Sequence, residues 1–110
     1  MKTVGWNSRG MASTAAERAL LDIQKQWGPD VLFLSGTHLN KVRAKKLRKK
    51  LKMDHIEVVE SVGASGGLIL YWRHSVVVQV LSKTRNFIDV VIGGTTEERW
   101  RLTGFYGEPR

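Results

Sequence analysis

Asn7 is the first residue placed where a side chain could take part in catalysis, because it follows residues 2–6, a short segment that is predicted to be a strand. Metal-dependent cleavage of a phosphodiester needs carboxylates that bridge a divalent cation to a phosphate oxygen, and a base for the attacking water. The matching position after the next predicted strand, residues 31–34, is Gly36. Glycine offers no side-chain ligand, so the two strand ends supply an amide without a neighbouring carboxylate.

The acidic residues that remain near predicted strand ends do not form a pair whose spacing indicates a shared ion. We predict structural roles for all of them, and we predict surface or packing roles for the histidines, because none forms a motif with an orienting carboxylate. The acidic residues are Asp30, Asp54, Asp89 and Glu108, and the histidines are His38, His55 and His74.

A basic segment at residues 41–52 is the second feature that could do chemistry. It contains eight Lys and Arg residues and no acidic residue. Such a segment could neutralise several phosphates and bind nucleic acid weakly, without sequence preference and in a salt-dependent way. The alternative is the solvated face of an amphipathic helix, which is the more common role of a charge run. The candidate nucleic-acid contacts are Lys45, Lys46, Arg48, Lys49 and Lys52.

Length and composition restrict the setting of these residues. A chain of 110 residues with 42% hydrophobic and 25% charged residues is typical of one globular domain, residues 1–110. The absence of cysteine excludes disulfides, thiolate metal sites and a cysteine nucleophile. No signal peptide or membrane-spanning run is apparent, so we expect an intracellular protein without membrane contact, in the nucleus or the cytoplasm.

The elements that position these residues follow from periodicity and turn signals. A strand at residues 2–6, a helix that begins near Thr14 and ends before Gly28, and a strand at residues 31–34 predict a βαβ unit. Asn40 can cap a second helix that reaches about Leu51. The β-rich runs that follow predict antiparallel strands, and they lie at residues 56–60, 67–72, 76–81, 87–92 and 99–105.

Five segments together resemble a known family. They read VGWNSRGM, PDVLFLSGTHL, SVGASGGLILYW, FIDVVI and RLTGFYGEP, and they run in this order over nearly the whole chain. In this order and spacing they resemble the start of the exonuclease–endonuclease–phosphatase superfamily, and more narrowly the endonuclease domain of plant LINE-type non-LTR retrotransposons. The resemblance implies an α/β fold, the first half of a four-layer α/β/β/α sandwich (βαβα followed by antiparallel strands), and a Mg²⁺-dependent DNA endonuclease in the intact family.

The resemblance transfers unevenly to individual residues. Asn7 matches the asparagine that helps to orient the metal-binding carboxylate and the phosphate, and Tyr106 matches an active-site tyrosine. Gly36 stands where the family has its metal-binding glutamate. The family's catalytic aspartates and general-base histidine lie in segments beyond the point that corresponds to Arg110. We therefore expect Asn7 and Tyr106 to be inherited positions without function, and no metal or other cofactor in this chain.

These observations predict a truncated, inactive remnant of a retrotransposon-type endonuclease domain. The alternatives are residual Mg²⁺-dependent nicking, a non-catalytic nucleic-acid-binding module that uses the basic helix, and a partial or decayed gene product with no function of its own. If the second sheet of the sandwich is missing, one face of the strands at residues 67–72 and 76–81 meets water. An uncovered apolar face of this kind predicts self-association.

Overall fold

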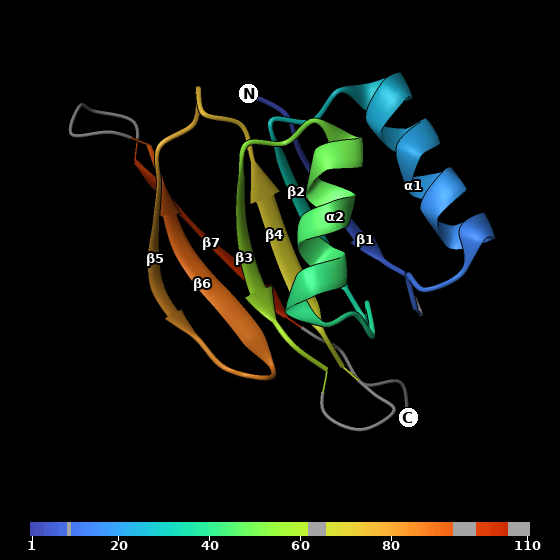
Figure 1. Ribbon diagram of the computed structural model, residues 1–110. Helices are drawn as coiled ribbons and strands as arrows, with labels where there is room; N and C mark the ends of the chain where they lie inside the picture. Colours follow the sequence, from blue (N-terminus) through green and yellow to red (C-terminus); the bar gives the residue numbers. More distant parts are fainter. Residues whose placement is uncertain (9, 62–65, 94–98, 106–110) are drawn as a thin grey trace.

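The computed structural model describes residues 1–8, 10–61, 66–93 and 99–105. In this part of the chain, two helices and two sheets form three layers, helix on sheet on sheet (Figure 1). The elements are β1 (Thr3–Asn7), α1 (Thr14–Trp27), β2 (Val31–Ser35), α2 (Lys41–Leu51), β3 (His55–Val59), β4 (Leu68–Trp72), β5 (Val78–Lys83), β6 (Phe87–Ile92) and β7 (Trp100–Phe105). The mixed α/β class and the βαβα order followed by antiparallel strands, which were expected from the sequence, are confirmed.

The first sheet has the strand order β1-β2-β4-β3. β1 and β2 are parallel, with α1 as the connection between them, so the predicted βαβ unit is present. β4 runs antiparallel to both of its neighbours. Because β1 and β2 point the same way, both end at one edge of the sheet, whereas β4 ends at the opposite edge.

Both helices begin and end where local chemistry satisfies their free backbone groups. The Ser13 hydroxyl accepts from the Ala16 amide at 3.1 Å and caps α1, which begins at Thr14 as predicted. Asn40 caps α2 as predicted, accepting from the Arg43 amide at 2.9 Å. Both helices end on a residue in the left-handed conformation, Gly28 and Lys52.

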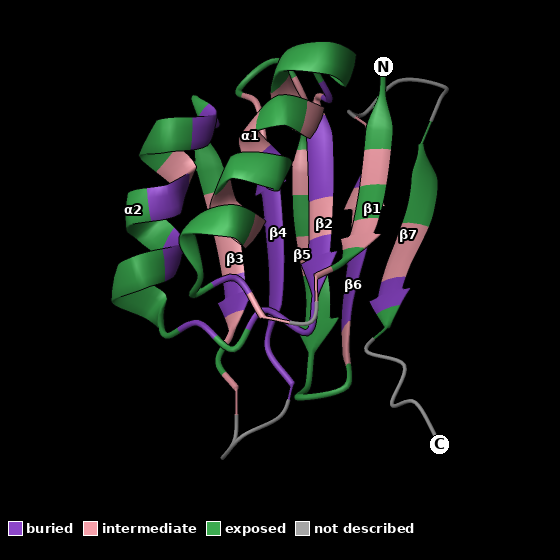
Figure 2. Cartoon of the chain, turned by 90° about the vertical axis from the view of Figure 1, so that its right-hand side faces the viewer, coloured by how far each residue is buried: buried purple, intermediate pink, exposed green. Residues whose placement is uncertain are grey.

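The helices cover one face of the first sheet with a shared apolar core. α2 buries one side and exposes the rest, as Figure 2 shows. The buried residues of α2 are the predicted ones, Ala44, Leu47 and Leu51. The buried Tyr71 hydroxyl of β4 donates to the Ala44 carbonyl at 2.8 Å, and burial raises the pKa of this phenol, so it remains a donor.

The other face of the first sheet is covered by the second sheet, whose strand order is β5-β6-β7. Leu68 and Leu70 of β4 pack in one apolar cluster with Ile88 and Val90 of β6, and both leucines are at most 1% exposed. The expectation that the second sheet is missing, and that one face of β4 meets water, is therefore wrong. Three strands from the second half of the chain supply that sheet.

The outer face of the second sheet carries no further layer among the described residues. Phe87, Asp89 and Val91 of β6 alternate with the inward residues of that strand, and they lie on this outer face. Phe105 of β7 is 64% exposed and Leu81 of β5 is 45% exposed. The apolar surface that could associate therefore lies on the second sheet and not on the first. In the described part of the chain, no helix is long and apolar enough to cross a membrane.

Candidate functional site

The candidate site lies at the edge of the first sheet where β1 and β2 end, and we call it the β1–β2 edge. Asn7 stands directly opposite Ser35 in the parallel register, with Asn7 exposed and Ser35 buried. The chain segments that follow the two strands run on together: the Ser8 amide donates to the Ser35 carbonyl at 2.9 Å, and the Met11 amide donates to the Thr37 carbonyl at 2.8 Å. Asn7 is thus held at this edge by a backbone frame.

Gly36 is part of that frame through its backbone. Its carbonyl accepts from the Gly10 amide at 2.6 Å and from the Ser8 hydroxyl at 3.3 Å. Gly36 is buried and has φ +66°, in the left-handed region that is costly for residues with a side chain. A glutamate at this position would have to adopt strained backbone or move the segment.

A second close approach fixes the same edge from the side of β4. The Thr37 amide donates to the Gly67 carbonyl at 3.2 Å, and Thr37 is completely buried. Gly67 has φ +95°, and a Cβ atom at this position would lie 2.6 Å from the Thr37 hydroxyl oxygen. Only glycine fits here, so the segments after β2 and before β4 are locked against each other.

The donor set at the β1–β2 edge does not fit a magnesium ion. Magnesium is held in proteins by carboxylates, usually with several waters. The described residues contain no group of three or more His, Cys, Asp or Glu that could hold a metal ion. Asn7 contributes an amide, and the Ser8 hydroxyl is engaged as a donor to the Ser35 carbonyl at 3.0 Å. Tyr106, the other inherited position, lies outside the described residues.

Two of the acidic residues for which structural roles were predicted, Asp30 and Asp54, accept hydrogen bonds from residues distant in the sequence. Asp30 accepts from the Lys2 amide at 2.9 Å. The His74 amide and imidazole both bind the Asp54 carboxylate at 2.9 Å, and these hydrogen bonds lower the pKa of Asp54. Glu108 lies outside the described residues. The sequence reasoning passed over Glu60, whose carboxylate accepts from the Lys41 amide at 2.9 Å at the first residue of α2.

Asp89 lies apart from the β1–β2 edge, on the outer face of the second sheet. Arg101 holds its carboxylate with two hydrogen bonds, and the Thr103 hydroxyl adds a third at 3.0 Å. The hydrogen bonds from Arg101, followed by that from Thr103, hold the pKa of Asp89 below its usual value despite the opposing effect of burial. The site is therefore an ion pair that joins β6 to β7.

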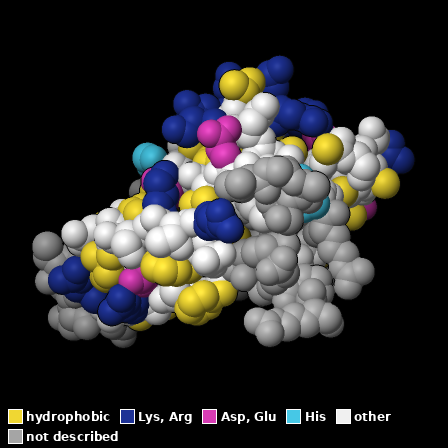
Figure 3. All heavy atoms as spheres, turned by 90° about the horizontal axis from the view of Figure 1, so that it is seen from below, with side chains coloured by type: hydrophobic (Ala, Val, Ile, Leu, Met, Phe, Trp, Pro, Cys, Tyr) yellow, Lys and Arg dark blue, Asp and Glu magenta, His cyan; other side chains and the backbone are white. Residues whose placement is uncertain are grey.

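The basic helix divides into two kinds of residue. Arg48 is half-buried, and its guanidinium donates to the Met53 carbonyl at 2.9 Å, so it closes the C-terminal end of α2. The other four candidates are exposed, and they are Lys45, Lys46, Lys49 and Lys52. Viewed from the β1–β2 edge, Lys and Arg side chains gather in separate groups over the surface (Figure 3).

The comparisons with known proteins bear on the fold. No family model matches the chain, and no curated protein matches it in sequence. Among solved structures it is similar to the AP endonuclease LMAP from Leishmania major, with a TM-score of 0.65 and 17% sequence identity. The match covers 94% of this chain and 39% of that enzyme. This likeness shows that the chain shares its fold with part of that enzyme.

Proposed function

We propose that the chain is the N-terminal part of a nuclease-like domain of the non-LTR retrotransposon type, and that it has no catalytic activity of its own. The β1–β2 edge supports this proposal, because Asn7 is held in a hydrogen-bonded backbone frame while position 36 carries a glycine with φ +66°. A phosphodiesterase site of this family would need a carboxylate at position 36 to hold its cation, and Gly36 cannot supply one.

In an intact member of the family, magnesium would supply charge neutralisation at the scissile phosphate and lower the pKa of a bound water. The contribution that this chain can make is smaller. The exposed Asn7 amide can donate a hydrogen bond to a phosphate oxygen and position it at the end of β1. This contact by itself orients a phosphate and does not cleave it.

A plasmid-relaxation assay tests the proposal. Supercoiled DNA is incubated with the chain in Mg²⁺ or Mn²⁺, with and without EDTA, and beside the Asn7→Ala variant. We expect the same background for all samples. Nicking that requires the metal and disappears in Asn7→Ala would contradict the proposal, because it would mean that the β1–β2 edge binds a cation despite Gly36.

A second candidate function, weak nucleic-acid binding through α2, is favoured by the exposure of Lys45, Lys46, Lys49 and Lys52 on one short segment. Such binding would be insensitive to sequence and would weaken steeply with salt. Fluorescence anisotropy with labelled DNA at increasing salt concentrations measures it.

The structure decides which variants are informative for this second candidate. Arg48 is unsuitable, because its loss would also disturb the end of α2. The test variant is Lys45→Glu/Lys49→Glu, and the control is Arg85→Glu/Arg99→Glu, which reverses the same number of exposed charges on the second sheet and its turns. Affinity that ignores salt, or that falls equally in both variants, would remove this candidate.

A further inference from the structure

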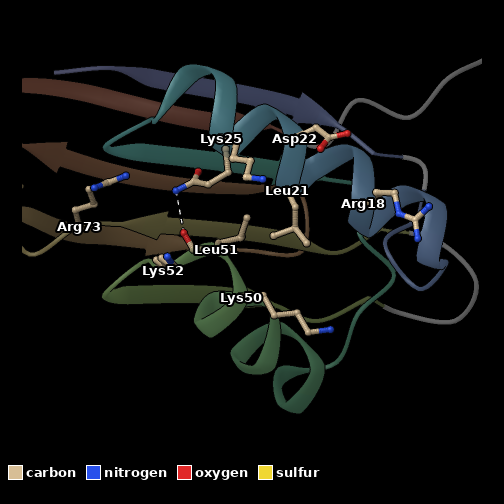
Figure 4. A pocket seen from close by; sticks show the side chains of 9 residues that line it. Arg18, Leu21, Asp22, Lys25, Lys50, Leu51, Lys52 and Arg73 are labelled. Atoms are coloured by element: carbon tan, nitrogen blue, oxygen red, sulfur yellow. Dashed lines mark hydrogen bonds between the residues drawn. The ribbon is translucent and has the colours of Figure 1, made fainter.

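A groove between the two helices is a concave surface that the proposed function does not use. Its volume is about 530 Å³, within the usual range for small-ligand sites. It is lined by Arg18, Leu21, Asp22, Gln24, Lys25, Lys50, Leu51, Lys52 and Arg73 (Figure 4). We call it the α1–α2 groove. Arg73 follows β4, and the first residue of β2, Val31, pairs with Trp72, so this part of the groove lies at the end of the sheet opposite to the β1–β2 edge.

The groove is built on a fixed base. The Gln24 side-chain amide of α1 donates to the Leu51 carbonyl at the end of α2 at 2.9 Å, which ties the two helices together. Leu21 and Leu51 lie between the helices and give the groove an apolar component (Figure 4). Charged groups beside apolar surface are less screened than those in open water, so contacts made here are stronger than on a flat surface.

The charge in the groove is strongly one-sided. Five cationic side chains line it, against the single carboxylate of Asp22. Lys50 makes an ion pair with Glu17, which lies outside the lining. Arg73 is anchored by a hydrogen bond from its Nε to the Pro29 carbonyl at 3.2 Å, which positions its guanidinium. Figure 4 places Arg18 and Arg73 toward opposite ends of the groove, with lysines between them.

Helix stabilisation explains only part of this arrangement. Lys25 and Lys50 lie in the last turns of α1 and α2, where cations interact favourably with the helix dipole. Arg18 lies in the first half of α1, and Arg73 follows a strand, so the dipole of neither helix accounts for them. These two arginines come from segments far apart in the sequence, and the fold brings them to one groove.

We infer that the α1–α2 groove binds a small ligand that carries a chain of phosphate groups. Arginine binds phosphate oxygens through paired N–H donors, and lysine adds point charges. A phosphate chain offers several anionic groups to the five cations that line the groove, whereas a single small anion could contact few of them. The phosphate chain is the shared chemistry of inorganic triphosphate and of a nucleoside triphosphate, whose base would in addition contact Leu21 and Leu51.

Isothermal titration calorimetry with inorganic triphosphate and with ATP tests this inference on the wild-type chain. We expect binding of one ligand per chain that weakens as salt is raised. The variant Lys25→Gln/Lys52→Gln removes two exposed charges from the groove and should weaken binding about tenfold. The control Arg85→Gln/Arg99→Gln removes the same charge elsewhere and should retain the wild-type affinity.

The two ligands identify the source of the phosphate chain: equal affinities indicate free oligophosphate, and tighter binding of ATP indicates a nucleotide. Three results would overturn the inference. They are no saturable binding at low salt, equal losses in the groove variant and the control, and an equal loss in Lys45→Gln/Lys49→Gln, which would assign binding to the whole basic helix. Circular dichroism melting of each variant confirms that it is folded. None of these results depends on nuclease activity, so this inference can fail independently of the proposed function.

Discussion

The two ends of the first sheet differ in how they are built. At the β1–β2 edge, backbone hydrogen bonds and glycines in left-handed conformations lock three chain segments together, but the described side chains bring no cluster of carboxylates. At the opposite end the chain segments are also joined by backbone hydrogen bonds, since the Asp30 amide donates to the Lys2 carbonyl at 2.8 Å and the Arg73 amide donates to the Asp30 carbonyl at 3.0 Å. Five cationic side chains line the α1–α2 groove there. Both ends therefore have a backbone frame, and the groove end adds a one-sided set of charged side chains.

The β1–β2 edge is maintained by the fold itself, whereas the groove depends on the charges of exposed side chains. The geometry of the β1–β2 edge follows from strand pairing and close glycine contacts, which stability maintains whether or not chemistry takes place there. The charges of the groove contribute little to stability, because exposed charges interact weakly. Substitutions at the edge should therefore change stability, and substitutions in the groove should change ligand binding.

The largest expected effect is at the β1–β2 edge. Gly67→Ala should lower the free energy of unfolding by about 2–4 kcal/mol, because its Cβ atom would lie 2.6 Å from the Thr37 hydroxyl oxygen in a strained backbone conformation. Urea denaturation measures it. Gly66→Ala is the matched control: Gly66 also has positive φ, but no atom lies within 4 Å of the added Cβ. Equal losses in the two variants would show that the close contact with Thr37 is unimportant.

A smaller stability effect is expected at the base of the groove. Gln24→Ala removes the hydrogen bond to the Leu51 carbonyl and should cost about 1 kcal/mol in thermal or urea unfolding. The control is Gln26→Ala, on the exposed side of α1, which should change the free energy of unfolding by about 0.5 kcal/mol at most. A neutral result for Gln24→Ala would mean that this hydrogen bond does not hold the helices together.

The ion pair on the second sheet is expected to stabilise the fold at neutral pH and to lose that effect in acid. The pKa of Asp89 is held below its unfolded value, so its stabilising contribution is complete above that unfolded value and is lost as the pH falls through the folded pKa. The acid-unfolding curve of Asp89→Asn should therefore be flatter below pH of about 4 than that of the wild type. Parallel curves for the two proteins would show that Asp89 does not contribute to acid unfolding.

The smallest effect concerns self-association, which we propose occurs through the outer face of the second sheet. Phe105→Ser should reduce any concentration-dependent rise of the sedimentation coefficient, because Phe105 is 64% exposed beside Phe87. Val42→Ser is the control, since Val42 of α2 is exposed to a similar extent, 62%. A wild-type chain that sediments as a monomer at all concentrations would contradict the proposal.

Sequence patterns predicted the local elements better than the partners of those elements. Periodicity and capping residues identified both helices, and the buried face of α2 followed from the positions of Ala44, Leu47 and Leu51. A βαβ unit places two strand ends at one edge, which is why Asn7 and Gly36 could be associated before the structure was known. The second sheet was missed, because the alternation of apolar residues in β5 does not specify which sheet that strand joins.

The groove and the role of Arg48 were not accessible to the same reasoning. Arg18 and Lys25 lie on α1, Lys50 lies on α2 and Arg73 follows β4, and only the packing of these elements brings them to one groove. Arg48 looks identical to its basic neighbours in the sequence, but its position beside the turn after α2 gives it backbone partners. The run of basic residues therefore predicted that α2 is basic, but it did not predict the groove that we infer to be a ligand site.

Titration of the ¹⁵N-labelled chain with Mn²⁺ tests the central claim most directly, because a bound paramagnetic ion broadens the resonances of nearby nuclei. Because Gly36 supplies no carboxylate and the described residues hold no group of three or more metal-binding side chains, we predict no saturable broadening of the Asn7 side-chain amide or of Gly36 at millimolar Mn²⁺. Saturable broadening of both signals at one ion per chain, lost in Asn7→Ala, would contradict the account and place a metal centre at the β1–β2 edge.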